Sequence, residues 1–282
     1  FYFSPALSAH LRRARGVYDI VHVQGVHSLV APVALASVRA AGIPSVLTFH
    51  TGGHSSGVRG ALRPMQWKLL APLLRTTRAL VAVCEYERHT FARALGVAEA
   101  RIRLIPNGCT PLPIDTGAAQ ITGAPLLVSA GRLERYKGHH RLIEAMPTVL
   151  RRSPDAMLAV VGTGPYEQSL RDLAVRLGVA DRVLIGGFGP EQRGALGRVV
   201  SDADVVCLLS EYEAHPVAVL EALSAGTPVL VADTSGLSEL GRRGLVTTVG
   251  LGSSPQEIAA RVLDVAGGGK TAAPVLPSPS TI

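Results

Sequence analysis

Short runs of Val, Ile and Leu alternate with longer segments of helical periodicity along most of the chain, and this alternation restricts the fold more than any other feature. The short runs are apolar at nearly every position, which is typical of strands covered on both faces, as in a parallel sheet. Chains that alternate strand and helix in this way fold as layered α/β domains. In the first part of the chain the predicted strands are residues 18–23, 44–49, 79–84 and 101–106, and the predicted helices are residues 28–41, 61–77 and 85–95.

Residues 109–124 interrupt the alternation with a segment rich in Pro, Gly and Thr, which is typical of a linker. We therefore predict two Rossmann-like parallel-sheet domains facing a cleft, an incomplete N-terminal one over residues 1–108 and a C-terminal one over residues 125–266. The Gly-, Pro- and Ser-rich residues 267–282 predict a disordered tail. In the second domain the predicted strands are residues 126–131, 157–162, 182–187, 204–209 and 228–232, and the predicted helices are residues 140–152, 166–177 and 218–225.

The composition fits a folded protein with an excess of positive charge, since 28 Lys and Arg stand against 21 Asp and Glu, a net charge of +7. A basic surface can bind nucleic acid, anionic lipid or phosphorylated ligands. Only Lys68, Lys137 and Lys270 are lysines, and the other basic residues are arginines beside abundant Ala, Gly and Val. We attribute the overall charge to this composition and predict no nucleic-acid partner.

Cysteine usage and the absence of long apolar runs indicate the compartment. The cysteines at 84, 109 and 207 show no paired spacing, which predicts free thiols in a reducing, cytoplasmic setting rather than a disulfide framework or a zinc site. No run approaches the roughly 18 apolar residues that a membrane-spanning helix needs. The opening FYFSPALSAHLRR has no initiator Met and no signal-peptide pattern, so we expect a fragment of a longer protein.

The loop GRLERYKG, residues 131–138, follows a predicted strand and carries two cations. Ligands of open parallel sheets bind beyond the carboxyl ends of the strands, where this loop lies. Gly131 permits a sharp turn there, and Arg132 and Lys137 can converge on one anion. Two solvated cations at a helix start would instead oppose the helix dipole at a cost of about 0.3–1 kcal/mol. The loop therefore favours a phosphate site.

Three further motifs are weaker. Gly162 and Gly164 open a strand-to-helix turn that lets a ligand approach the backbone, although a purely structural turn explains them equally well. Position 167 is Glu, so the three-glycine dinucleotide fingerprint is incomplete. GGGKT at 267–271 follows a helix rather than a strand and is no Walker A loop. The pair Asp202 and Asp204 precedes its strand on the edge away from the cleft, so we predict no metal site.

Two glutamates, Glu213 and Glu221, stand eight positions apart in an otherwise small and apolar stretch. Glu213 lies in a loop at the carboxyl end of a strand and Glu221 about one turn into the next helix. A carboxylate accepts hydrogen bonds from sugar hydroxyls, and the peptide N–H groups around Val217 and Val219 begin the helix and would face an anion. This order suits a ligand of the type sugar–diphosphate–ribose. A solvated loop Glu and a helix-start Glu that complements the dipole are the alternative.

Together, GRLERYKG, GTGP and Glu213-x7-Glu221 with EALSAGTPVLVAD closely resemble the C-terminal domain of glycosyltransferase family 4. The resemblance extends over roughly residues 18–266. It implies the GT-B fold of two domains and a retaining transfer of a hexose-type sugar from a nucleotide-diphospho-sugar to an acceptor hydroxyl of a glycan, lipid or small molecule. It also implies that the enzyme uses no metal and no cofactor besides the donor.

The resemblance assigns roles residue by residue. It implies that Arg132 and Lys137 bind the donor diphosphate and offset the charge of the leaving group, that Glu213 contacts the transferred sugar and that Glu221 binds the ribose hydroxyls. His50, in TFHTGGHSS after an N-domain strand, matches a His that lies beside the donor sugar, with His54 as the second choice. We expect His50 and Glu213 to orient the sugar.

Two departures from the family leave alternatives open. By comparison with the family, we expect that residues 1–282 lack the first strand and glycine-rich loop of the N-domain and the helix that crosses back at the C-terminus. The chain is therefore either part of an active transferase or a truncated, non-catalytic remnant that keeps a nucleotide-sugar pocket. A dinucleotide oxidoreductase shares the layered fold but lacks support from the glycines.

The basic, apolar segment 59–75 carries the single tryptophan of the chain. It predicts either a core-packing helix or an amphipathic helix in peripheral contact with an anionic membrane, at its inner face. Pro64 and Pro72 are expected to interrupt any long regular helix there.

Overall fold

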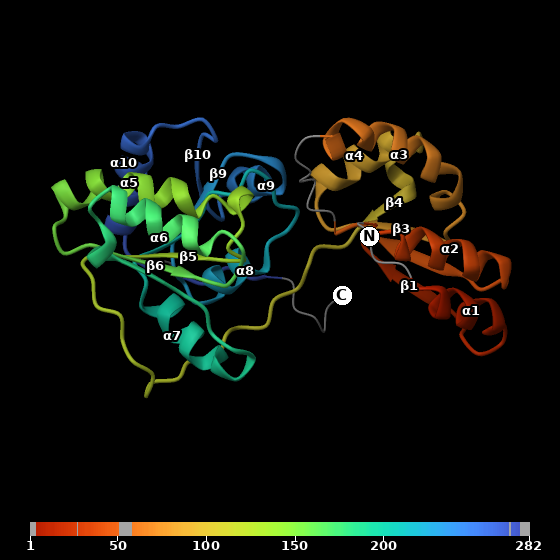
Figure 1. The fold of residues 1–282 in the computed structure, drawn as a ribbon, viewed down its shortest axis with the longest axis horizontal. Coiled ribbons are helices and arrows are strands. Elements are labelled where there is room, and N and C mark those ends of the chain that lie inside the picture. Colours follow the sequence, from red (N-terminus) through yellow and green to blue (C-terminus); the bar gives the residue numbers. More distant parts are fainter. Residues whose placement is uncertain (1–3, 27, 51–57, 271, 277–282) are drawn as a thin grey trace. The chain divides into compact units, whose positions relative to one another are not determined.

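The computed structural model describes residues 4–26, 28–50, 58–270 and 272–276 (Figure 1). The chain divides into two compact units, Phe1–Pro106 and Asn107–Ile282. Each unit contains one parallel sheet with helices packed on it, which is the α/β architecture that the alternation of strands and helices predicts. Residues 271 and 277–282 of the predicted tail lie outside the described residues, and the last helix includes Gly267.

Unit 1 is built on a four-stranded sheet whose order follows the chain, β1-β2-β3-β4. Val23 lies opposite Leu47, and Leu47 opposite Leu80, so these side chains share the face that packs against the helices. The elements are α1 (Pro5–Arg13), β1 (Val21–Gln24), α2 (Val30–Ala40), β2 (Ser45–Thr48), α3 (Val58–Leu74), β3 (Ala79–Ala82), α4 (Glu85–Leu95), a 3₁₀ turn (Glu99–Arg101) and β4 (Ile102–Leu104).

Helix α3 corrects the prediction that its prolines interrupt it, because it runs continuously over Val58–Leu74. Pro72 lies in the last turn, where it removes one i→i−4 hydrogen bond and places its ring against the carbonyl of Lys68, a cost that other contacts must offset. Tertiary packing holds this end: Leu74 is fully buried and the Trp67 ring meets the Phe91 ring edge to face, with centroids 5.0 Å apart. These contacts support the core-packing interpretation of the helix. Leu69 is nevertheless exposed, and membrane contact stays a prediction.

Unit 2 has a six-stranded parallel sheet with the order β10-β9-β8-β5-β6-β7. From β5 the chain builds outward through β6 and β7, and it then returns to add β8, β9 and β10 on the other side. The elements are β5 (Leu126–Ala130), a 3₁₀ turn (Arg135–Lys137), α5 (His139–Arg152), β6 (Met157–Val161), α6 (Glu167–Arg176), a 3₁₀ turn (Ala180–Arg182), β7 (Val183–Gly186), a 3₁₀ turn (Pro190–Gln192), α7 (Arg193–Asp202), β8 (Val205–Leu208), α8 (Val217–Ser224), β9 (Val229–Ala232), α9 (Ser235–Arg242), β10 (Thr247–Val249) and α10 (Pro255–Gly267).

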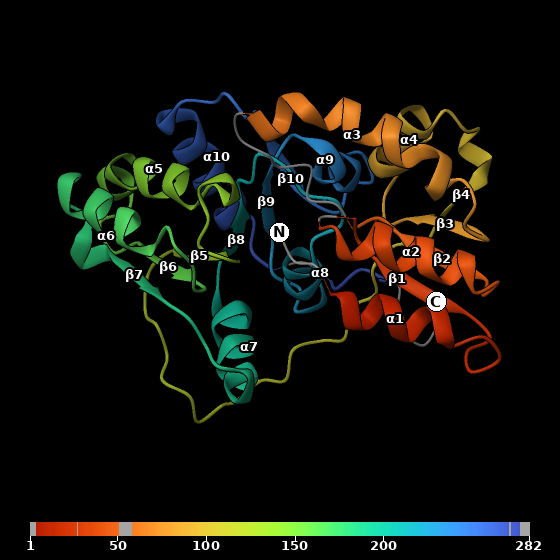
Figure 2. The ribbon, with the colours of Figure 1, turned by 45° about the vertical axis from the view of Figure 1, so that its right-hand side comes forward.

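The pleat of β5 separates two cores on opposite faces of the unit 2 sheet. Leu127 belongs to the core formed with α5, α6 and α10, whereas Leu126 and Val128 belong to the core formed with α7, α8 and α9. Figure 1 and Figure 2 show α5 and α6 on one side of the sheet and α7 on the other. The central strands β5, β6, β8 and β9 are therefore covered on both faces, as their continuous apolar runs predict, whereas the edge strand β7 has exposed positions.

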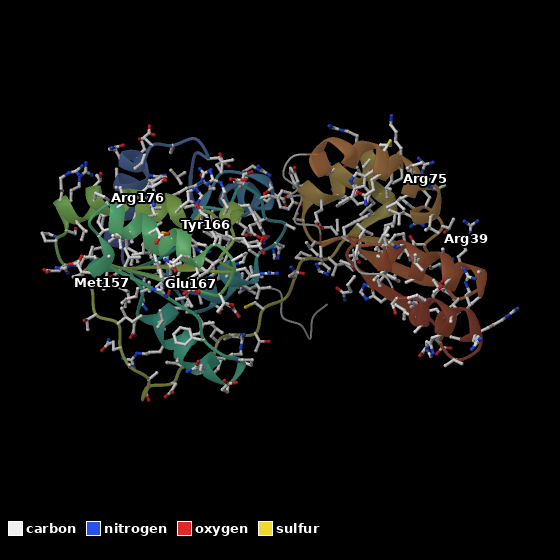
Figure 3. The ribbon with its side chains drawn as sticks, in the orientation of Figure 1. Arg39, Arg75, Met157, Tyr166, Glu167 and Arg176 are labelled. Carbon is white, nitrogen blue, oxygen red and sulfur yellow. The ribbon has the colours of Figure 1, made fainter. Side chains whose placement is uncertain are left out.

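Basic residues are spread over the helices of both units rather than gathered in one place. Arg39 and Arg75 in unit 1 and Arg176 in unit 2 are exposed (Figure 3). Within the described residues, no helix is both long enough and apolar enough to cross a membrane.

Candidate functional site

The loop after β5 is fixed by close backbone packing against the loop after β6. The Leu133 N–H donates to the Thr163 carbonyl at 3.0 Å, and the Tyr166 N–H donates to the Leu133 carbonyl at 2.9 Å. A Cβ added to Gly162 would overlap the Gly131 carbonyl, and a Cβ added to Gly164 would overlap the backbone of Leu133. Both glycines are thus required by loop-on-loop contact, which supports the structural interpretation of the GTG motif.

The same packing brings Lys137 to the end of β8. The Lys137 ammonium lies 2.6 Å from Glu213 Oε1, although the two residues are 76 positions apart. The exposed fractions of the two side chains are only 16% and 11%, so the pair is largely shielded from water. The hydroxyl of Ser210, which is fully buried, lies 2.9 Å from the same carboxylate oxygen as its donor. Lys137, Ser210 and Glu213 form one connected cluster, which we call the Lys137–Glu213 cluster.

Gly138 joins this cluster to helix α5. Its φ is +75°, a left-handed conformation that glycine adopts without strain, and a Cβ there would overlap the Leu209 carbonyl. Because only glycine fits, the backbone of the loop can approach the end of β8 closely enough for Lys137 to reach Glu213.

The backbone of Glu213 is held by the start of α9. The Glu213 N–H donates to the Ser235 hydroxyl at 2.9 Å, and the Gly236 N–H donates to the Glu213 carbonyl at 2.9 Å. Ser235 has a φ of +46°, which a non-glycine residue rarely adopts. A Cβ on Gly236 would overlap the Ala214 carbonyl, so this contact also requires glycine.

Sequence reasoning did not select Ser210, Ser235 or Gly236. Ser210 directly follows a predicted strand, a position that the search of strand ends could have included. Ser235 and Gly236 gave no comparable signal, since their partner Glu213 lies 22 residues before Ser235.

Arg132 is placed in the same loop but does not join the cluster. Its guanidinium pairs with Glu134 Oε1 at 3.1 Å, and its side chain is 75% exposed. The cation that sequence reasoning paired with Lys137 therefore faces solvent, while Lys137 is shielded. This arrangement leaves the Arg132 guanidinium accessible to a ligand.

Helix α8 starts four residues after Glu213 and carries Glu221. The helix begins at Val217, after Pro216, and the Val219 N–H already donates to the Pro216 carbonyl at 3.2 Å. Glu221 accepts from Arg193 of α7 at 2.8 Å. Its charge, together with the larger effect of burial, raises the pKa of Cys109. Glu221 thus lies within a charged neighbourhood formed by α7, α8 and the segment that precedes β5.

His50 belongs to unit 1, whereas the other predicted site residues belong to unit 2. It follows the buried Phe49 at the end of β2, is half-buried and has a φ of +43°. A strained backbone in a non-glycine residue is found where the surrounding structure imposes it, frequently at ligand sites. His54 lies outside the described residues.

Both aspartates of the Asp202–Asp204 pair have partners within unit 2. Asp204 Oδ2 accepts from the Leu126 N–H at 2.7 Å, and Asp202 pairs with Arg198 at 2.6 Å. In the part of the chain that the structure describes, no group of three or more His, Cys, Asp or Glu side chains could hold a metal ion.

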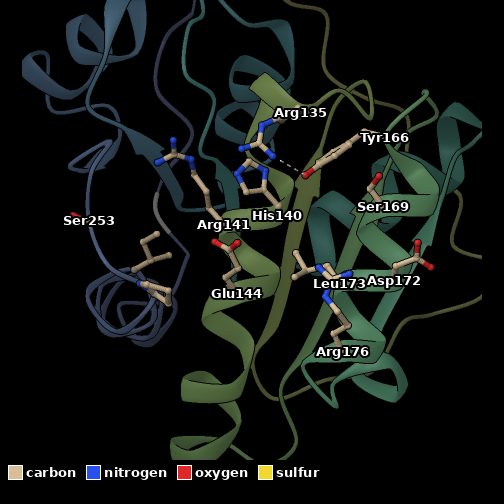
Figure 4. Close-up of a pocket in the computed structure, with 12 residues that line it drawn as sticks. Arg135, His140, Arg141, Glu144, Tyr166, Ser169, Asp172, Leu173, Arg176 and Ser253 are labelled. Carbon is tan, nitrogen blue, oxygen red and sulfur yellow. Dashed lines mark hydrogen bonds between the residues drawn. The ribbon is translucent and has the colours of Figure 1, made fainter.

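A pocket of about 600 Å³ lies on the outer side of α5, α6 and the start of α10 (Figure 4). Arg135 Nη1 donates to the Tyr166 hydroxyl at 3.4 Å, and the His140 and Tyr166 rings meet edge to face. Burial, followed by the positive charges of nearby arginines, lowers the pKa of His140 to about 4. This pocket is lined by neither Lys137 nor Glu213, so it is separate from the predicted site.

Family models match both units. Residues 117–273, more than half of the chain, match the glycosyl transferases group 1, and residues 1–111 match glycosyltransferase family 4.

Curated relatives belong to the same class. A GDP-mannose-dependent alpha-(1-6)-phosphatidylinositol monomannoside mannosyltransferase of Mycobacterium tuberculosis is 31% identical over 251 residues, which cover 83% of this chain and 64% of that protein. A glycogen synthase of the same organism is 30% identical over 245 residues, which cover 86% of this chain and 58% of that protein. The chain thus spans less than two thirds of the length of these relatives.

Solved structures share the fold. HepE of Anabaena, in complex with UDP and glucose, superposes with a TM-score of 0.74 at 21% identity, covering 92% of this chain and 71% of that one. Sucrose-phosphate synthase of Thermosynechococcus elongatus superposes with a TM-score of 0.73 at 19% identity, covering 96% and 73%. With two parallel-sheet units, this fold and these family matches, the chain belongs to glycosyltransferase family 4 and has the GT-B fold.

Proposed function

We propose that the chain is the donor-binding and catalytic part of a retaining glycosyltransferase that moves a hexose from a nucleotide-diphospho-sugar to a carbohydrate hydroxyl. The observation that carries this proposal is the Lys137–Glu213 cluster. Its members come from the loops after β5 and β8, the two neighbouring strands at which the sheet order reverses. Ligands of such sheets bind at this reversal, beyond the carboxyl ends of the strands.

The chemistry of the cluster suits the two ends of such a donor. An ammonium binds a diphosphate and offsets the negative charge that grows on it as the bond to the sugar C1 breaks. A carboxylate accepts hydrogen bonds from sugar hydroxyls and so fixes the orientation of the sugar. Under this proposal Lys137 and the exposed Arg132 bind the diphosphate, Glu213 binds the sugar and Glu221 binds the ribose.

The other predicted residues complete the site. Gly131, Gly162 and Gly164 shape the loops, and His50 is proposed to orient the sugar. The Val217 amide at the start of α8 faces the diphosphate, and the Val219 amide would share its hydrogen between the diphosphate and the Pro216 carbonyl. The acceptor oxygen takes the place of the diphosphate oxygen at C1 with retention of configuration, and the proton of the acceptor hydroxyl passes to the departing diphosphate. We infer that the reaction needs no metal, because two cationic side chains supply the charge that a metal ion would supply.

The setting of the reaction is part of the same proposal. The lack of paired spacing among the cysteines points to a reducing compartment, and we infer a cytoplasmic protein. One relative is a GDP-mannose-dependent enzyme and one solved structure holds UDP, so both bases enter the test.

Calorimetric titration of the 282-residue chain with UDP and GDP tests the proposal. Each charge-assisted contact contributes about 1.5–3 kcal/mol, so the Arg132→Ala/Lys137→Ala double variant is expected to weaken binding by at least about 100-fold. The matched control is Arg261→Ala, which removes a half-exposed cation of α10 and leaves the site intact. Equal binding by the double variant and the control contradicts the diphosphate site.

Turnover then separates the enzyme from the non-catalytic alternative. Incubation with UDP-glucose and GDP-mannose and a panel of glycan and lipid-linked acceptors is expected to release free nucleotide. In Lys137→Ala this release is expected to fall by two or more orders of magnitude. The same assay is repeated with a chain extended to the length of its relatives. If that chain binds nucleotide tightly but releases no nucleotide from any donor, the non-catalytic alternative is correct.

A further inference from the structure

His139 is the first residue of α5 and is fully buried, yet no role in the proposed reaction has been assigned to it. Its ring makes two hydrogen bonds. Nδ1 lies 2.8 Å from the hydroxyl of Ser129 in β5, and Nε2 lies 3.1 Å from the carbonyl oxygen of Arg132. The ring therefore connects the end of the strand to the loop that carries Arg132.

The two partners fix which ring nitrogen carries the proton. A carbonyl oxygen only accepts, so Nε2 must carry a hydrogen and donate it to Arg132. Burial of the ring lowers the pKa of His139, which leaves the imidazole neutral near pH 7. In the neutral ring Nδ1 is then the acceptor, and the Ser129 hydroxyl donates to it. Every polar atom of the buried ring is satisfied in this single arrangement.

The position of His139 links it to both cations of the proposed diphosphate site. It lies two residues after Lys137, across Gly138, whose conformation is set by contact with the Leu209 carbonyl. It also lies under the glycine that precedes Arg132, since a Cβ on Gly131 would be 3.9 Å from its Cε1. Residues 137–139 thus carry the Lys137 ammonium at one end and, at the other, the His139 ring that hydrogen-bonds to the Arg132 backbone.

We propose that His139 is a positioning residue that sets the Arg132 loop relative to Lys137, so that the two cations meet the same diphosphate. This inference rests on the proposed function. The Arg132 carbonyl also accepts from the Glu134 N–H at 2.9 Å, and Leu133 stays bonded to the loop after β6. Removal of the His139 bond is therefore expected to shift the Arg132 peptide group relative to Lys137 rather than to release the whole loop. The exposed guanidinium of Arg132, which has no buried contact of its own to hold it, then loses its defined position.

Two substitutions divide the roles of the ring nitrogens. His139→Gln can place its amide nitrogen where Nε2 lies and so keeps the donor to Arg132. His139→Asn is shorter and can replace only the contact that Nδ1 makes with Ser129. The matched control is Thr227→Val, which removes another fully buried hydrogen bond of unit 2, the one from the Thr227 hydroxyl to the Val200 carbonyl at 2.8 Å.

Titration with UDP, GDP and ADP tests the proposal in the 282-residue chain. We expect His139→Asn to weaken diphosphate binding by about tenfold, the value of one hydrogen bond, while His139→Gln and Thr227→Val stay within about twofold of wild type. In the Arg132→Ala background, His139→Asn is expected to cause no further loss, because the residue acts through Arg132. Full additivity of the two changes, or equal weakening by Thr227→Val, overturns the positioning role.

Two further results keep the inference separate from the proposed function. If the wild-type chain binds none of the three nucleotides, the proposed function is wrong. If the wild-type chain binds and His139→Asn binds equally well, only the positioning role is wrong. Nitrogen-15 NMR of the wild-type histidines reports on the ring without any ligand. A neutral His139 with its proton on Nε2 is expected, and a proton on Nδ1 overturns the inference even where a variant fails to fold.

Discussion

The two units use the same building plan but arrange their strands differently. The described strands of unit 1 follow one another in chain order across the sheet, whereas the strand order of unit 2 reverses at β5 and β8. Consecutive parallel strands are joined by right-handed crossovers, so helices change face only where the order reverses. Such a reversal opens a crevice at the carboxyl edge of the sheet. Among the described strands, only unit 2 has this geometry, and the Lys137–Glu213 cluster lies there.

The two units also differ in how deeply their strands are buried. The strands β8 and β9 of unit 2 are buried at every position, whereas β1 and β4 at the edges of the unit 1 sheet alternate between buried and exposed residues. The prediction of strands covered on both faces therefore holds for the centre of unit 2 and is wrong for these two strands of unit 1. A sheet covered on both faces fixes its loops more firmly, which suits a site that depends on contacts of about 3 Å.

Substitution of Gly138 is expected to cause the largest difference in stability between the two units. Gly138→Ala adds a Cβ that overlaps the Leu209 carbonyl at a positive φ, so we expect a loss of about 4 kcal/mol in the free energy of unfolding of unit 2. Gly178→Ala in unit 2 and Gly42→Ala in unit 1 have similar positive φ values with nothing within 4 Å, and each is expected to cost only about 1 kcal/mol.

Urea unfolding can assign these losses to a unit, because Trp67 is the single tryptophan and lies in unit 1. Tryptophan fluorescence therefore follows unit 1, and far-ultraviolet circular dichroism follows both units. Gly138→Ala should move the circular dichroism transition alone. A loss equal to that of Gly178→Ala would show that the Leu209 contact is unimportant.

Acid is expected to destabilise unit 2 by a smaller amount. Burial lowers the pKa of His215 to about 4, so between this value and 6.5 the unfolded chain binds a proton that the folded chain does not. Stability therefore falls as the pH is lowered through this window. The expected loss from His215 is of the order of 3 kcal/mol between pH 7 and pH 4.

The variant His215→Leu is the control for this pH dependence. It removes one titrating group, so the slope of the unfolding free energy against pH should decrease in this window, while His139 and His140, whose pKa values are also lowered, keep contributing to it. If the slope of the variant equals that of the wild type, His215 does not cause the acid loss.

The smallest expected change in stability comes from the N-cap serines of α10 and α1. Ser254 accepts from the Glu257 N–H and its own N–H donates to the Glu257 carboxylate, a complete capping box for α10, whereas Ser4 makes a single bond to the Leu7 N–H of α1. We expect Ser254→Ala to cost about 1 kcal/mol in unit 2 and Ser4→Ala about 0.5 kcal/mol in unit 1. Alanine keeps the backbone N–H bond of the box but loses the bond that the Ser254 hydroxyl donates to the Glu257 carboxylate at 2.9 Å. Equal losses in urea unfolding would show that this hydroxyl-to-carboxylate bond adds nothing.

The fold class was accessible from the sequence because apolar periodicity records which faces a strand or helix buries. Helices α7 and α9 were missed because each contains two glycines, which weaken the helical pattern. Their buried residues, such as Val199 and Leu237, pack on the sheet and override that weakness. Local propensity could not show this packing, and the same reason explains the continuous α3.

Part of the candidate site was also accessible. The motifs placed Lys137 and Glu213 at strand ends, where parallel sheets bind ligands. Their direct pairing was not accessible, because it depends on β8 lying beside β5, and periodicity does not encode strand order. His139 was missed because a histidine after a glycine gives no signal until its two partners are known.

The Lys137–Glu213 pair also determines which solutes the proposed site discriminates against. A small inorganic anion gains the lysine only by competing with a carboxylate that already lies 2.6 Å from it. A ligand that brings both an anion and hydroxyl groups gives each partner a replacement at the same time. If the pair forms the proposed donor site, we expect it to bind a phosphorylated polyol more tightly than free phosphate.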